Sequence, residues 1–326
     1  MRPMPVRILM LVTALAVMPL GGCTGLQSTA LPAPGPRIAA PARIRLGSLP
    51  TEDALPLWAA QQGIFDKVGL SVRLVPFASA DKRDAAFKSG AIDGYVGDIL
   101  SVARLSSEGL NNRIVTICLG ATPSQGRFGL VVARGSRLRL ASQLDNVPIA
   151  TSSGTIEEFV LDGLMHANAR PGVLNEQIVE NVPERFNSLM SGKVKAAVLP
   201  EPYLSLALRR GAHLVADDTK GANLSQTVIA LSDSFLATPG GISAANRLLG
   251  AWDAAASMVN SHRKIFRPLL AKKASLPAAL RLHYRMNTYP HHQLPTRQQV
   301  SAVLAWMQRK GLLRAMPEYA DVTWTP

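Results

Sequence analysis

Short apolar segments alternate with amphipathic helical segments along most of the sequence, and this alternation limits the fold more than any other feature. The first cycle runs from an alternating strand pattern at residues 44–48 to a helical pattern at 53–65. Further short strands are expected at 70–75, 91–97, 114–119, 129–133, 147–150, 178–179, 195–199 and 227–231. Because strands that alternate with helices form mostly parallel sheets covered by helices, the sequence predicts an α/β fold.

The alternation stops once and restarts, which indicates two lobes. The strand at 129–133 has no helix before it, so we interpret residues 121–133 as a crossing into a second lobe and 227–231 as the returning strand. The expected divisions are 43–130 and 227–326 for the first lobe, with helices at 243–261 and 296–310, and 131–226 for the second. A chain of 326 residues, 47% hydrophobic, is long enough for two such lobes. The two crossing strands, near Val131 and Val228, are expected to carry a hinge.

The N-terminus has the pattern of a bacterial lipoprotein leader. A basic start is followed by an apolar run at 8–20 that is short for a permanent membrane span. The run ends in Leu20-Gly21-Gly22-Cys23, which resembles the lipobox whose cysteine receives diacylglycerol. We therefore predict a signal peptide at 1–22, a lipidated Cys23 and a proline- and alanine-rich tether at 23–42. An ordinary secreted protein with a stray cysteine is the alternative. The predicted location is extracytoplasmic, in the periplasm or on the outer face of the cell membrane.

Composition and spacing argue against several other classes. The net charge of +13 is spread over the chain without an aromatic-interleaved basic stripe, so nucleic acid is not an expected partner. With only two cysteines a disulfide framework is excluded, and Cys118 in its apolar strand is expected to be a buried thiol. The adjacent histidines His291 and His292 lack further ligands at metal spacing. No cofactor, metal or catalytic residue is predicted.

Three further stretches resemble one transport family. They are residues 53–65, residues 89–94 (Ser-Gly-Ala-Ile-Asp-Gly), and residues 192–203, which end in Glu201-Pro202-Tyr203. Together with the lipobox they are similar to the nitrate, sulfonate, taurine and thiamine-precursor group of ABC-transporter solute-binding proteins. The resemblance covers about residues 44–311, although Lys195 stands where the family usually has an acidic residue. It implies a periplasmic-binding-protein type II fold with a double-crossover hinge and a helical C-terminal tail.

Candidate ligand residues in the second lobe lie where strands end. Pro200 cannot donate to a sheet ladder and Pro202 suits a first helical turn, so Glu201 occupies a corner between strand and helix. Glu201 can accept a hydrogen bond from a ligand and Tyr203 can stack on one; helix capping and packing between lobes are the alternatives. The loop before the helix at 156–168 offers amides and hydroxyls to a polar or anionic group, with simple capping as its alternative, through Ser153, Gly154 and Thr155.

Candidates in the first lobe occupy equivalent corners. Thr51 and Asp53 follow the first strand, Ser79 the second and Asp98 the third, and for each of them helix capping is as plausible as ligand contact. Arg127, in the crossing segment, can pair with an anionic ligand or lie solvated beside the hinge.

The combined expectation is a lipid-anchored, monomeric binding protein that captures a small polar or anionic molecule between two lobes and delivers it to an ABC permease. Two alternatives stay open. One is an enzyme of thiamine- or menaquinone-precursor metabolism with the same bilobed fold, although such an enzyme needs no export leader. The other is a ligand sensor for a membrane signalling partner. The ligand itself is not identified by the sequence: the basic charge favours an anion, whereas Glu201 and Asp98 suit an amine or pyrimidine.

Overall fold

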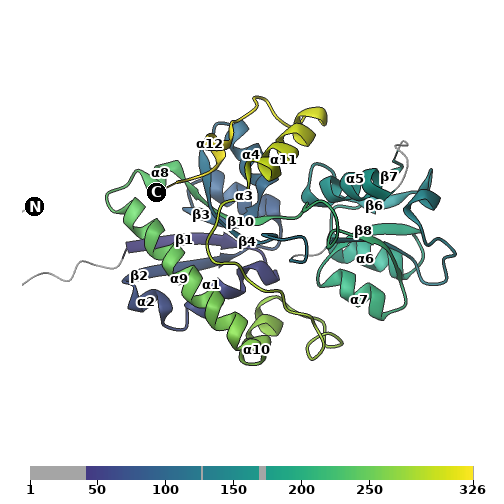
Figure 1. Cartoon of the computed structure of the whole chain (residues 1–326), viewed down its shortest axis with the longest axis horizontal. Helices are drawn as coiled ribbons and strands as arrows, with labels where there is room; N and C mark the ends of the chain where they lie inside the picture. Colours follow the sequence, from purple (N-terminus) through teal and green to yellow (C-terminus); the bar gives the residue numbers. More distant parts are fainter. Residues whose placement is uncertain (1–41, 126–127, 169–173, 326) are drawn as a thin grey trace, which may run out of the picture. The chain divides into compact units, whose positions relative to one another are not determined.

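The computed structural model describes residues 42–125, 128–168 and 174–325, which contain two five-stranded mixed sheets flanked by helices (Figure 1). The first sheet has the order β2-β1-β3-β10-β4, formed by Leu70–Pro76, Ala42–Ser48, Gly94–Asp98, Thr227–Ser232 and Asn112–Leu119. The second has the order β7-β6-β8-β5-β9, formed by Glu176–Ile178, Ile149–Thr151, Ala196–Pro200, Phe128–Val132 and His213–Asp217. The predicted α/β class with two lobes is confirmed.

In each sheet one strand runs against the others. In the first sheet β10 pairs antiparallel with both β3 and β4, whereas β1 pairs parallel with β2 and β3. In the second, β5 pairs antiparallel with β8 and β9, whereas β6 pairs parallel with β7 and β8. The reversed strands are the two that enter from the other sheet, β5 after β4 and β10 after β9. The parallel strands in each sheet therefore end on one edge, where the loops into the following helices gather.

We call the first sheet with its helices the first lobe and the second sheet with its helices the second lobe. The helices of the first lobe are η1 (Glu52–Ala54), α1 (Leu55–Ala60), α2 (Ile64–Lys67), α3 (Ala80–Lys88), α4 (Ile99–Ser107), α8 (Asp233–Leu236), α9 (Gly241–Ser261), α10 (Arg263–Lys273), α11 (Arg297–Arg309) and α12 (Tyr319–Val322). Those of the second lobe are η2 (Ala141–Leu144), α5 (Ile156–Asn168), α6 (Val182–Met190) and α7 (Tyr203–Arg209). Trp58 is buried in the largest hydrophobic cluster, and Cys118 is a buried free thiol as predicted.

Two segments, 120–127 and 218–226, join the lobes, and their described residues bind one another through side chains. Asp218 Oδ1 accepts the Phe128 N–H at 2.9 Å, so the second crossing holds the start of β5. Asn223 Nδ2 donates to the Gly120 carbonyl at 2.5 Å. Burial raises the pKa of Asp218 to about 6, opposed by its hydrogen bonds to Ser225 and Phe128. The two crossings thus form one hydrogen-bonded connection between the sheets.

The helices differ from the predicted ones at 53–65 and at 263–273, and the four-residue helices α8 and α12 were not predicted. The helical pattern at 53–65 forms η1, α1 and α2; Gly63, which takes a left-handed conformation with φ of 106°, separates α1 from α2. Helix α10 was not predicted, since Pro268 inside it reads as a helix breaker. Burial of Phe266 and Leu270 against the first lobe compensates for the missing hydrogen bond.

Candidate functional site

The predicted first-lobe residues lie in the loops that follow β1, β2 and β3. Thr51 and Asp53 belong to the loop and short helix after β1, Ser79 precedes α3 after β2, and Asp98 ends β3 and precedes α4. Because these three strands run parallel, their carboxyl ends bring the four residues to one edge of the first sheet.

Two of the four residues cap helices. Ser79 Oγ accepts the Lys82 N–H at 3.4 Å, and Asp98 Oδ1 accepts the Ser101 N–H at 2.7 Å. Thr51 makes no side-chain cap and instead donates through Oγ1 to Asp53 Oδ1 at 2.6 Å. Capping by Asp98 uses one carboxylate oxygen and so leaves it compatible with ligand contact.

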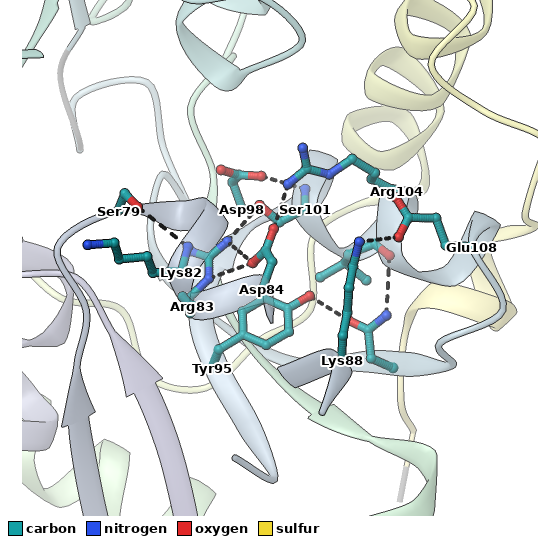
Figure 2. Close-up of polar contacts among 12 residues, drawn as sticks. Ser79, Lys82, Arg83, Asp84, Lys88, Tyr95, Asp98, Ser101, Arg104 and Glu108 are labelled. Atoms are coloured by element: carbon teal, nitrogen blue, oxygen red, sulfur yellow. Dashed lines mark hydrogen bonds and ion pairs between the residues drawn. The ribbon is translucent and has the colours of Figure 1, made fainter. Parts of the chain in front are cut away.

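A buried arginine, which the sequence analysis did not single out, lies under this edge (Figure 2). The Arg83 side chain donates to Asp84 Oδ1 at 2.9 and 2.7 Å, to the Val96 carbonyl at 3.0 Å and to Ser101 Oγ at 3.0 Å. Its guanidinium also lies over the Tyr95 ring, 4.9 Å from the centroid. With the Arg83 side chain this fully bonded, its charge is fixed in place beneath the loops and acts on them through space.

Burial is the largest influence on the pKa of each of the two first-lobe aspartates. It raises the pKa of Asp53, against the hydrogen bond from Thr51 and the positive charge of Arg83. Burial likewise raises the pKa of Asp98, against the charge of Arg83 and the bonds from Ser101. Arg83 is therefore the shared counter-charge that lets both carboxylates be buried at this edge.

Glu52, between Thr51 and Asp53, is the second residue missed by the sequence analysis. Its carboxylate accepts hydrogen bonds from Tyr284 Oη at 2.8 Å, from the Asn287 N–H at 2.6 Å and from Asn287 Nδ2 at 3.1 Å. Burial raises its pKa to about 7, against the hydrogen bonds from Asn287 and Tyr284, while the charge of Glu201 adds a further small increase. Glu52 thereby anchors the β1 loop to a distant segment and lies within electrostatic range of the second lobe.

In the second lobe, the loop between β6 and α5 is held by carboxylates of its own chain. The Gly154 N–H donates to Glu158 Oε2 at 2.5 Å, and the Ser153 N–H donates to Glu180 Oε1 at 3.3 Å. Thr155 Oγ1 donates to the Ser152 carbonyl at 3.0 Å. Thr151, which ends β6, is fully buried, and its Oγ1 has no hydrogen-bond partner among the described residues.

Glu201 and Tyr203 follow β8. Glu201 accepts from the Ser205 N–H at 3.2 Å and from Ser205 Oγ at 2.8 Å, which caps α7. The half-buried Tyr203 ring lies 5.4 Å from the Phe186 ring, so part of its surface packs within the second lobe. Glu201 therefore binds the start of its own helix and Tyr203 packs within its own lobe, which are the alternatives to ligand contact. The charge of Glu201 also acts on Glu52 of the first lobe.

Two predicted residues, Arg127 and Cys23, lie outside the described residues. Within the described ranges there is no group of three or more histidine, cysteine, aspartate or glutamate side chains able to hold a metal ion. Nor does any helix in that part of the chain have the length and apolarity needed to cross a membrane. Surface hollows at α8–α9 and along α6 contain none of the predicted ligand residues.

Comparison with solved structures identifies the architecture. The periplasmic aliphatic sulphonate binding protein SsuA from Escherichia coli aligns with a TM-score of 0.72 over 88% of this chain and 93% of its own, at 19% identity. The chain has the fold of the periplasmic solute-binding proteins. SsuA from Xanthomonas axonopodis pv. citri, bound to MOPS, gives a TM-score of 0.69 at 19% identity over 88% of this chain and 99% of its own.

The periplasmic nitrate-binding protein NrtA from Synechocystis PCC 6803 gives a TM-score of 0.66 at 16% identity, covering 84% of this chain and 83% of its own. No protein-family model matches the sequence, and no curated protein does. The structural neighbours match the group that the sequence resembles, and the predicted fold is confirmed at the level of the whole two-lobed architecture.

Proposed function

We propose that this chain is an extracytoplasmic solute-binding protein that captures a small polar molecule and delivers it to an ABC importer. One observation carries the proposal: two five-stranded sheets are joined by two crossing segments and present polar and charged loops at the ends of their parallel strands. Folds of this kind bind ligands at such strand ends. Two of the structural neighbours are sulfonate- and nitrate-binding proteins, which favours the same role.

The proposed ligand contacts come from both lobes. In the first lobe they are Thr51, Asp53, Ser79 and Asp98; in the second they are Ser153, Gly154, Thr155, Glu201 and Tyr203, with Arg127 from the crossing segment. Sulfonates, taurine, nitrate and thiamine precursors are the candidate classes. Carboxylates such as the buried Asp53 and the half-buried Asp98 accept hydrogen bonds, so they favour a ligand that carries donor groups, such as an amine or an aminopyrimidine, over nitrate.

The proposed mechanism is binding without covalent chemistry. A ligand held by both lobes favours the arrangement in which both sets of contacts form, by its difference in affinity for the two states. The hydrogen-bonded crossings, including Asp218 with Phe128, are short connections about which the lobes can rotate. Lipidation of Cys23 would keep the protein close to its permease and raise its effective concentration there.

A thermal-shift screen of the purified protein against sulfonates, taurine, nitrate and pyrimidines tests this function. A ligand that binds only the folded chain at 100 times its Kd adds about 2.7 kcal/mol to the free energy of unfolding, which is a clear rise in melting temperature. We expect at least one class to produce that rise with saturable binding.

Paired variants assign the rise to the proposed site. Asp98→Asn should lower ligand affinity by about tenfold or more, because it removes a half-buried charged acceptor, whereas Glu184→Gln on the exposed face of α6 should leave affinity unchanged. Turnover of any ligand would contradict the binding-only role and favour the enzyme alternative. A saturable ligand with no effect of Asp98→Asn would contradict the proposed contacts.

A further inference from the structure

Helix α11 of the first lobe contacts helix α5 of the second lobe directly. Trp306 Nε1 donates to Asp162 Oδ2 at 2.7 Å, and the Trp306 ring lies 5.5 Å from that of Phe159 in an edge-to-face arrangement. Phe159 belongs to the same hydrophobic cluster as the buried residues of α11. This contact is separate from the two crossing segments, so the lobes are also joined where the chain does not cross.

One lysine at the end of α11 forms ion pairs with three carboxylates of the second lobe. Lys310 Nζ lies 2.6 Å from Glu158 Oε1, 3.2 Å from Asp162 Oδ2 and 3.6 Å from Glu176 Oε1. Glu158 and Asp162 are four residues apart and therefore share a face of α5. Burial lowers the pKa of Lys310, but the bond to Glu158 and the charge of Asp162 outweigh it and leave the pKa above its ordinary value. The lysine is therefore charged at neutral pH.

The carboxylate of Glu158 connects this lysine to the β6–α5 loop. Its Oε1 atom faces Lys310, and its Oε2 atom accepts the Gly154 N–H at 2.5 Å. Gly154 has a φ of 66°, a left-handed conformation that residues with a Cβ rarely adopt. Leu312, two residues beyond Lys310, lies against the same glycine, 3.5 Å from the position a Cβ would occupy. The end of α11 thus contacts the loop both through Glu158 and directly.

We propose that Lys310 is a positioning residue for the β6–α5 loop, acting through Glu158 to hold the Gly154 amide and to fasten the loop of the second lobe to the first lobe. The importance of this loop for a ligand rests on the proposed function; the coupling itself does not. The Gly154 amide donates to Glu158 here, so a ligand that contacts this amide must displace the carboxylate from it. Loss of the lysine leaves three carboxylates together without their shared counter-charge, so Glu158 should leave the loop.

The alternative is an ion pair that affects only surface stability, since many half-exposed pairs contribute little. Amide hydrogen exchange read by NMR on the ligand-free protein separates the two. We expect Lys310→Met to accelerate exchange at Gly154 by about tenfold and to shift its amide proton resonance, while core amides such as Leu46 in β1 stay protected. Lys310→Arg should stay close to wild type, and Lys272→Met, at an exposed lysine of α10, is the matched control.

The double variant tests whether Lys310 acts through Glu158. Because Glu158→Gln removes the charge that the lysine holds, adding Lys310→Met to it should change Gly154 exchange by much less than Lys310→Met does alone. Additive effects, an unchanged Gly154 amide in Lys310→Met, or equal acceleration at Leu46 would each overturn the proposal. If Lys310→Met does not fold, Lys310→Gln, which also removes the charge, replaces it in both comparisons. No ligand is used, so failure here is distinct from failure of the ligand screen.

Discussion

At the scale of single residues, the candidate site is organised by buried charges that hold loops in position. Arg83 is 1% exposed and donates hydrogen bonds to Asp84. Its positive charge also stabilises the carboxylates of Asp53 and Asp98 through space. Glu52 performs the corresponding task for the β1 loop by accepting donors from Tyr284 and Asn287. Removing one partner from such a cluster leaves the others buried and uncompensated, so these positions should tolerate substitution poorly.

Glu52 makes the free energy of unfolding depend on pH, and the direction of that dependence follows from its raised pKa. Its pKa rises from 4.5 to about 7 on folding, so the folded protein holds a proton that the unfolded chain has already released between these values. The free energy of unfolding therefore falls as pH rises through that window, by roughly 3 kcal/mol if the group acts alone. Glu52→Gln should flatten this fall, measured by denaturant unfolding from pH 5 to pH 8.

A control is required because Asp218, with a pKa raised to about 6, contributes a fall of the same sign. That contribution is common to the wild type and to the Glu52→Gln variant, so it cancels in their difference. Glu184→Gln, at an exposed position of α6, should retain the wild-type slope. A Glu52→Gln variant with the full wild-type slope would show that another group titrates in this window.

Sequence reasoning found the residues whose roles are local and missed those whose roles are long-range. Asp98 was predicted as a plausible N-cap, because a carboxylate immediately before a helical pattern is a strong signal, and it caps α4. Arg83 and Glu52 gave no such signal: a charged residue within a helix or loop normally reads as solvent-exposed. Their partners Ser101 and Tyr284 are 18 and 232 residues away, a distance that no local pattern can encode.

At the scale of elements, most strands and long helices follow from the sequence, and short or unusual helices do not. The strands are short apolar runs bounded by turn residues, and α11 begins with the capping box of Thr296 and Gln299. By contrast, α8 and α12 span four residues each, too few to show helical periodicity, and α10 contains Pro268. Tertiary packing, not local propensity, forms these elements.

The crossing segments allow an element-scale prediction at two glycines. Gly120 and Gly221 both have positive φ, of 88° and 80°. A Cβ on Gly120 would lie 2.5 Å from the Ser225 carbonyl oxygen, whereas a Cβ on Gly221 would meet nothing within 4 Å. Gly221→Ala should therefore cost about 1 kcal/mol of backbone strain, and Gly120→Ala about 3 kcal/mol, because it also forces the two crossings apart.

Urea unfolding of the two alanine variants measures this difference, with Gly221→Ala as the matched control for left-handed strain. We expect a markedly lower midpoint for Gly120→Ala at an unchanged slope. Equal midpoints would show that the crossings can separate at no cost and that their close approach does not stabilise the connection between the lobes.

At the scale of the whole molecule, the strands and helices of both lobes belong to one compact unit, residues 41–326. The proposed anchor at Cys23 therefore lies outside the part of the chain that holds the strand-end loops. Membrane attachment and ligand binding should accordingly be separable functions. A single acyl chain gives only marginal membrane binding, so the diacylglycerol of a lipobox cysteine, with its two chains, is the modification that would hold the protein stably.

Cys23→Ser tests that separation in bacterial cells that process lipoproteins. In detergent phase partitioning, the acylated wild type should enter the detergent phase. The Cys23→Ser variant should enter the aqueous phase, because it cannot receive the lipid. The melting temperature and the ligand-induced rise should not change, since no residue of the compact unit is altered. Cys118→Ser is the matched control. It should stay in the detergent phase because Cys23 still receives the lipid, whereas the Cys118 thiol is buried within β4 and takes no part in the anchor. A wild-type protein found in the aqueous phase would remove the anchor from the proposed function while leaving the binding site untouched.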